Sequence, residues 1–144
     1  MSERSVSAAL PRRIIERSGN RCEYCLVPAG VAFFPHEVDH IVAIKHGGKT
    51  NETNLAFTCW RCNRHKGTDL GSFDPLTGDF SFLFNPRGQN WDDHFGLQGV
   101  ELMGKSSEGR TTAQLLQLNT IERLTERQRL VEVGLYPDKS ASLG

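Results

Sequence analysis

Hydrophobic and polar positions change their spacing several times along the 144 residues of the chain. Residues 7–18 have a helical pattern, with Pro11 near the first turn, where a missing amide hydrogen is tolerated. Residues 31–34 are apolar and predict a short strand. Residues 36–44 alternate and are rich in β-branched side chains, which predicts a second strand. The first third of the chain is therefore expected to be a helix followed by two strands.

The next segment, residues 45–54, is a polar loop around the pair Gly47-Gly48. Glycine permits backbone conformations that other residues rarely adopt, which suits a tight loop. We expect residues 55–66 to form a helix and Gly67 to end it. This β-β-loop-α order is short, so its hydrophobic core must be small.

Turn signals are dense in residues 71–87, at Asp74-Pro75, Thr77-Gly78 and Asn85-Pro86. Phe80 and Phe82 alternate between these turns, which predicts a hairpin or an extended arm. Residues 91–102 are expected to be a short strand region.

Two helices are expected near the end of the chain, at residues 111–118 and 119–133. The second has an apolar stripe at helical spacing, formed by Ile121, Leu124 and Val131.

These elements predict an α+β fold with a helix in residues 1–19, a core in residues 20–70, and an extension of hairpin and helices in residues 71–144 that packs on the core. The length allows one compact domain, or a small domain with an appendage. No stretch is long and apolar enough to span a bilayer, so we expect no membrane association.

The charges balance, with 17 Lys and Arg against 17 Asp and Glu. Residues 1–72 carry ten basic and seven acidic side chains, whereas residues 73–144 carry seven and ten. Overall charge therefore gives no argument for nucleic-acid binding. Any such site must be a local basic patch.

The four cysteines form two Cys-x-x-Cys pairs, Cys22/Cys25 and Cys59/Cys62. Two such turns can direct four thiolates at one tetrahedral Zn²⁺. A disulfide framework would need an oxidising compartment, but the N-terminus lacks a charged start followed by an apolar run, and we expect a cytoplasmic protein. A redox role fits two pairs in one short span poorly. The spacing favours a closed structural zinc site that compensates for the small core.

Asp39 and His40 lie between the two cysteine pairs. A carboxylate is a hard ligand that suits Mg²⁺ or Mn²⁺, and an imidazole can accept a proton from water. An Asp-His pair by itself is most often an ordinary surface feature. Its position inside the cysteine frame favours an acid-base centre.

Together these segments resemble the HNH endonucleases, also called ββα-metal or His-Me finger nucleases, in the branch with a four-cysteine zinc site. The resemblance covers residues 20–68. The matching segments are Cys22-x-x-Cys25, Glu37-Val38-Asp39-His40-Ile41, Gly47-Gly48, Asn54-Leu55, Cys59-x-x-Cys62-Asn63 and Lys66-Gly67.

The resemblance implies a small ββα-metal core clipped by zinc, and it implies a role for each residue at its centre. His40 would be the general base that activates water. Asp39 and Asn63 would hold the catalytic divalent ion, and Asn54 would fix the loop and help to hold the base.

Many members of the family have His where this chain has Asn63. Asp39 and Asn63 offer only oxygen ligands, which favours Mg²⁺ or Mn²⁺ over zinc or nickel. His65 is a less favoured alternative ligand, because its helical direction differs from that of Asn63 by about two hundred degrees.

Such a centre would cut DNA to leave 5′-phosphate and 3′-hydroxyl ends. Basic side chains on the helix and in the glycine loop are candidates for holding flanking phosphates, or are solvated surface positions: Arg61, Arg64, Lys66, Lys45 and Lys49. Trp60 is expected to pack against the zinc knuckle, although a ring near DNA can also stack on bases.

The leading hypothesis is therefore a metal-dependent DNA endonuclease or nickase of bacterial or phage type. It would act as a monomer or homodimer, with or without an accessory protein. The alternatives are an inactive zinc-stabilised nucleic-acid-binding module, a nuclease toxin or effector domain and, more remotely, a protein-binding adaptor. Only the nuclease hypotheses explain why Asp39, His40, Asn54 and Asn63 occur together.

Overall fold

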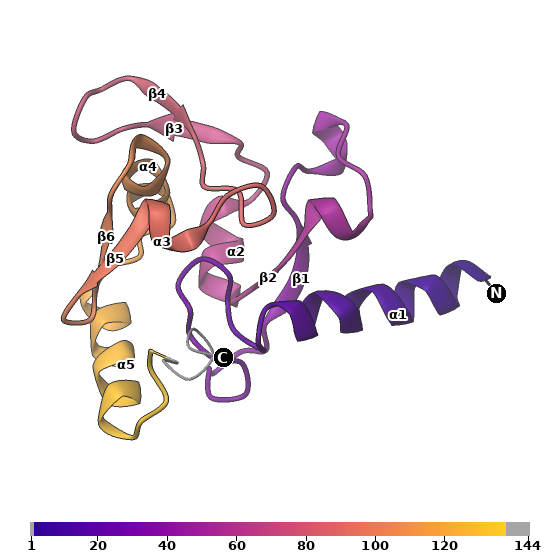
Figure 1. Cartoon of the computed structure of the whole chain (residues 1–144), viewed down its shortest axis with the longest axis horizontal. Helices are drawn as coiled ribbons and strands as arrows, with labels where there is room; N and C mark the ends of the chain where they lie inside the picture. The colour runs from indigo at the N-terminus through magenta and orange to yellow at the C-terminus, as the bar shows by residue number, and fades with distance from the viewer. Residues whose placement is uncertain (1, 138–144) are drawn as a thin grey trace.

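The computed structural model describes residues 2–137, with side chains from Ala9 onwards, and shows an α+β fold (Figure 1). The last seven residues of the predicted extension lie outside this range. In chain order the elements are α1 (Ser2–Arg17), β1 (Glu37–His40), the 3-10 turns η1 (Ile44–His46) and η2 (Glu52–Asn54), β2 (Leu55–Thr58), α2 (Trp60–Lys66), β3 (Gly71–Phe73), β4 (Phe80–Phe82), α3 (Trp91–His94), β5 (Phe95–Gln98), β6 (Glu101–Gly104), α4 (Ser107–Leu115) and α5 (Ile121–Glu132).

The centre of the fold is the antiparallel pair β1–β2, followed directly by α2. Glu37 pairs with Thr58 and His40 with Leu55, so the loop of residues 41–54 joins the strands at the end where His40 lies. α1 covers one face of this pair, and its Leu10 and Ile14 form a small core with residues of β2.

Two predictions for this region are wrong. Residues 31–34 form bends instead of a strand, and residues 55–58 form β2 instead of the first turn of a helix. All four residues of β2 are buried, and a fully buried apolar run does not distinguish strand from helix. The helix starts only after Cys59, whose Sγ atom caps it by accepting from the amide of Cys62.

The predicted hairpin is confirmed as β3–β4, in which Phe73 pairs with Phe80. Its strands pack on α4. Phe73, Phe80 and Phe82 are exposed to 63%, 58% and 67%. The hairpin therefore presents a row of phenylalanine rings to solvent.

The remaining elements differ in detail from the prediction. Residues 91–94 form the short helix α3 before the hairpin β5–β6 begins. The two C-terminal helices are present, but the apolar stripe of α5 is wrong: Ile121 is 82% exposed, and α5 buries Arg123, Arg127 and Leu130 instead. Both arginines find partners inside, because Arg123 faces sulfur atoms and Arg127 donates to the carbonyl of Val100 and the side chain of Asn119.

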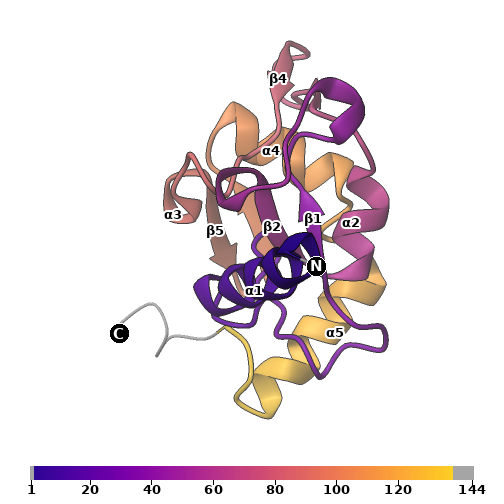
Figure 2. The ribbon, with the colours of Figure 1, turned by 90° about the vertical axis from the view of Figure 1, so that its right-hand side faces the viewer.

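The main hydrophobic core joins the cysteine turns to the extension. It includes all four cysteines and, from the extension, Phe84, Phe95, Leu102 and Leu116. Figures 1 and 2 show β5, β6 and α5 gathered on the side of the ββα core away from the start of α1. The described part of the chain contains no helix that is long and apolar enough to cross a membrane.

Candidate metal and catalytic centre

The four cysteines meet in one buried cluster. Their Sγ atoms all lie within 4.8 Å of one another, and those of Cys25 and Cys59 are 3.7 Å apart. That separation is far too long for a disulfide. It matches the edge of about 3.8 Å expected for a tetrahedron with Zn–S bonds of about 2.3 Å. The cluster can therefore hold one zinc ion with no coordination position left open.

The backbone around the cysteines also suits bound thiolates. The amides of Cys25 and Cys62 point at the Sγ atoms of Cys22 and Cys59, at 3.5 and 3.4 Å. Burial raises the pKa of Cys22 and Cys62, because a thiolate there has lost its water. A divalent cation is the group that would stabilise four thiolates in such surroundings.

Side chains from the C-terminal extension complete the surroundings of this cluster, and no motif in the sequence predicts them. Arg123 of α5 donates to Cys62 Sγ. Tyr136 donates its hydroxyl to the carbonyl of Cys25 at 2.8 Å, and Trp91 donates its indole N–H to the carbonyl of Tyr24 at 2.9 Å. The extension is therefore part of the wall around the cysteines.

Asp39, His40 and Asn63 lie on neighbouring elements, because β1 ends at His40 and packs against α2. All three side chains are half-buried. Within the described residues, neither the Asp39 carboxylate nor the Asn63 amide makes a side-chain hydrogen bond. The side-chain oxygens of Asp39 and Asn63 are therefore available to a hard cation. Water molecules would complete the coordination sphere of that cation.

His40 is held from two sides. Its Nε2 lies 2.7 Å from Oγ1 of Thr50 in the loop between the strands. Its carbonyl accepts a hydrogen bond at 3.3 Å from Nζ of Lys66 on α2. Burial lowers the pKa of Lys66, against the opposing effect of Asp39 and Asp69. Thr50 has no sequence signal of its own, since a threonine in a polar loop is unremarkable.

Asn54 closes the loop that carries Thr50. Its Oδ1 accepts from the amide of Val42, and its Nδ2 donates to the carbonyls of Val42 and Lys49, all at 2.9 Å. Gly48 lies against the same groups, since a Cβ atom there would come 2.8 Å from Asn54 Nδ2 and closer still to the Val42 carbonyl. The loop geometry therefore depends on both residues.

The family model described as HNH endonuclease matches residues 22–69, which include the four cysteines, Asp39, His40, Asn54 and Asn63. By this match, which covers a third of the chain, residues 22–69 form an HNH domain. The four-cysteine cluster agrees with the zinc-binding branch of that family.

The chain is also similar to Septu protein PtuB from Bacillus thuringiensis, with 29% identity over 120 residues. The alignment covers 82% of this chain and 44% of the relative. The chain thus spans less than half the length of that relative. No solved structure matches this chain.

The basic residues of the HNH domain fall into three environments. Lys45, Lys49 and Arg64 are exposed. Arg61 is half-buried and lies 3.7 Å from the Glu122 carboxylate. Lys66 is buried and is bonded to the His40 carbonyl, so it lies beneath the end of β1 and not on the open helix surface.

His65 lies on another side of α2. Burial lowers its pKa, and so do the charges of Arg123, Arg64 and Arg61. Its electrostatic neighbours are therefore arginines, which would not favour a metal ion beside it.

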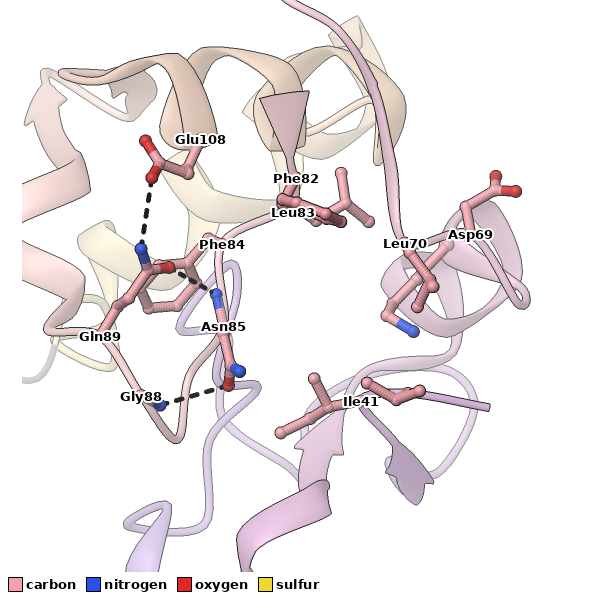
Figure 3. Close-up of a pocket in the computed structure, with 12 residues that line it drawn as sticks. Ile41, Asp69, Leu70, Phe82, Leu83, Phe84, Asn85, Gly88, Gln89 and Glu108 are labelled. Carbon is pink, nitrogen blue, oxygen red and sulfur yellow. Dashed lines mark hydrogen bonds between the residues drawn. The ribbon is translucent and has the colours of Figure 1, made fainter. Parts of the chain in front are cut away.

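A pocket of about 400 Å³ separates the HNH domain from the extension beside this centre (Figure 3). Ile41, Lys66 and Leu70 line it from the domain. The opposite wall comes from the extension, where the side chain of Gln89 accepts from the amide of Asn85 and reaches Glu108 (Figure 3). This wall combines apolar side chains with the amides of Asn85 and Gln89 and the carboxylate of Glu108, and it contributes no basic side chain to the pocket lining.

Proposed function

We propose that the chain is a metal-dependent endonuclease or nickase that hydrolyses phosphodiester bonds in DNA. The observation that carries this proposal is the position of His40 within an HNH domain. Its Nε2 lies 2.7 Å from Thr50 Oγ1 at the end of β1. Asp39 precedes it on the same strand, and Asn63 lies on α2, which packs against β1. Neighbouring elements thus carry a candidate general base and two candidate oxygen ligands, which together would act on one phosphate.

In this proposal His40 takes the proton from the attacking water. We assign Nε2 as the donor to Thr50 Oγ1, so Nδ1 is the nitrogen that would accept this proton. Asp39 and Asn63 would hold Mg²⁺ or Mn²⁺, which supplies charge stabilisation at the phosphate and at the leaving 3′-oxygen. The products would carry 5′-phosphate and 3′-hydroxyl ends.

The four cysteines have a different task. We propose that they hold Zn²⁺ that stabilises the fold and takes no part in hydrolysis, since four thiolates fill its coordination sphere. The exposed Lys45, Lys49 and Arg64, together with Arg61, would contact flanking phosphates. Lys66 would support the main chain at His40 instead.

Cleavage of supercoiled plasmid tests the proposal, with wild type and His40→Ala compared in EDTA, Mg²⁺ and Mn²⁺. We expect nicking that needs a divalent ion and is lost in His40→Ala, with zinc content and melting temperature unchanged. His65→Ala is the matched control and should keep its activity. Cutting by pure His40→Ala protein, or the absence of cutting by folded, zinc-loaded wild type in every metal, would contradict the proposal; the second outcome would favour a binding module.

A further inference from the structure

A row of aromatic rings runs outward from the first turn of α2. The ring centroids of Trp60 and Phe34 are 4.6 Å apart, and those of Phe34 and Phe33 are 4.8 Å apart. Trp60 precedes Asn63 by one helical turn, so the row begins beside a proposed metal ligand. Phe33, at its outer end, is 90% exposed.

Two arginines accompany this row. The guanidinium carbons of Arg61 and Arg64 lie 5.5 and 5.7 Å from the centroid of the Trp60 ring. Among the side chains that the structure describes, no carboxylate pairs with Arg64. Arg61 pairs with Glu122, whose side chain is 81% exposed. Two guanidinium groups therefore lie near the Trp60 ring, while Glu122 and Glu126 line the hollow beside Phe33.

Packing does not explain the position of Phe33 and Phe34. Residues 31–34 form no regular element, and Figure 2 shows their loop running past α2 and α5 at the edge of the molecule. Aromatic rings gathered on a surface usually mark an interaction site.

The charges decide what kind of partner would suit this site. Phe73, Phe80 and Phe82 of the hairpin are also exposed, but within the described residues no arginine lies over their rings. The row at Trp60 combines ring faces with guanidinium groups, and this combination binds bases and phosphates of single-stranded nucleic acid.

We propose that Phe33, Phe34 and Trp60 stack on unpaired bases of the DNA strand that enters the catalytic centre, while Arg61 and Arg64 hold its phosphates. The preferred substrate is then DNA with a single-stranded stretch next to the cut. This inference rests on the proposed nuclease function and adds the class of DNA on which it acts.

Binding by the inactive His40→Ala protein separates stacking from charge. The probes are labelled DNAs of about 16 nucleotides: a single strand, the same strand with a run of abasic sites, and the matching duplex. We expect the intact single strand to bind most tightly, because the abasic strand keeps its phosphates but lacks the stacking bases. Binding should also quench the fluorescence of Trp60, and Trp60→Phe should remove that signal.

Phe33→Ala is the decisive variant, since a ring that is 90% exposed can be removed without unfolding the chain. We expect it to weaken binding of the intact strand by roughly 5- to 150-fold, the effect of removing one stacked ring. Phe73→Ala, on the hairpin, is the matched control and should bind as before. Equal binding of intact and abasic strands, or equal losses in Phe33→Ala and Phe73→Ala, would overturn the inference.

Cleavage by the wild type keeps the two proposals apart. If base-dependent binding requires Phe33 but no DNA is cut, the stacking surface stands and the nuclease proposal fails. If duplex DNA is cut and Phe33→Ala changes neither cleavage nor binding, the nuclease proposal stands and the stacking surface fails.

Discussion

Arg123 donates from Nη2 to the Sγ atom of Cys62 at 3.1 Å, across 61 residues of sequence. The same nitrogen lies 3.7 Å from Cys59 Sγ, and Nη1 donates to the carbonyl of Leu116 at 2.9 Å. The side chain is 2% exposed. A zinc ion with four thiolates has a net charge of about −2, so this guanidinium offsets half of it. The contact ties α5 to the cysteine cluster of the HNH domain.

We therefore expect Arg123→Met to weaken zinc binding. Loss of a group that bonds to metal ligands typically lowers affinity by roughly 10- to 100-fold, and here it also leaves thiolate charge unbalanced in the core. Zinc transfer to a chromogenic chelator measures the affinity. Arg129→Met, at an exposed position of the same helix, should release zinc like the wild type. Equal release by the two variants would show that Arg123 does not support the metal site.

The sequence pattern of α5 does not predict that Arg123 is buried. An arginine in an amphipathic helix is normally assigned to the solvent face. Here Arg123, Arg127 and Leu130 follow the i, i+4, i+7 spacing of a buried stripe. The two arginines can be buried because sulfur and carbonyl groups from other parts of the chain accept their hydrogen bonds. Local pattern alone cannot show such partners.

Short-range spacing predicted much more of the HNH domain. The two Cys-x-x-Cys pairs predicted the four-cysteine cluster, because each pair brings two sulfur atoms together within one turn. β2 was misassigned, since a buried apolar run has no period that separates strand from helix. The place of Thr50 was beyond prediction, because it depends on how the loop folds back over His40.

Asp74 and Arg110 give a pH-dependent anchor for the hairpin β3–β4. Arg110 Nη2 lies 2.8 Å from Asp74 Oδ2, and Ser107 donates to the same oxygen at 2.9 Å. The Arg110 hydrogen bonds hold the pKa of Asp74 well below its usual value. The anchor is therefore fully present above the unfolded-state pKa of about 3.9, and it is lost as the pH falls through the lower folded-state value.

We expect Asp74→Asn to have a lower Tm than the wild type at pH 7, and the difference to shrink once the pH falls below about 4. Thermal unfolding across this pH range measures both effects. Asp79→Asn, exposed in the same hairpin loop, is the control and should melt with the wild type. If the difference in Tm does not change with pH, the charge of Asp74 is not what stabilises the fold.

Gly48 tests whether the loop between the strands sets the activity. A Cβ atom at this position would collide with the carbonyl of Val42 and crowd Nδ2 of Asn54. We expect Gly48→Ala to cost about 1–3 kcal/mol in stability and to reduce cleavage by more than the change in folded fraction. Gly47 has a positive φ of 89° and open space at its Cβ position, so Gly47→Asn, which tolerates that conformation, is the control. If the two variants are equally active at a temperature where both are folded, the loop geometry at Gly48 does not affect catalysis.

Thr50 provides the sharpest test of how His40 is used. If Nε2 donates to Thr50 Oγ1, the bond at 2.7 Å fixes both the orientation of the ring and the nitrogen that accepts a proton. Thr50→Val keeps the shape of the side chain and removes the acceptor. We expect kcat to fall roughly 3- to 10-fold, the worth of one hydrogen bond, while the Mg²⁺ concentration for half-maximal activity is unchanged. Thr50→Ser should restore the rate.

Measuring both kcat and the Mg²⁺ requirement distinguishes a Thr50 that orients the His40 ring from a Thr50 that only maintains the structure of the centre. Thr50 is exposed, so neither substitution should change zinc content or Tm. A distorted centre would displace Asp39 along with His40, because the two residues are adjacent on β1, and the Mg²⁺ requirement would then rise as the rate falls. Such a joint change, or a full rate in Thr50→Val, would show that Thr50 does not orient the base. If the Thr50 hydroxyl acts through the His40 imidazole, Thr50→Val lowers kcat without changing the Mg²⁺ requirement, and Thr50→Ser restores kcat.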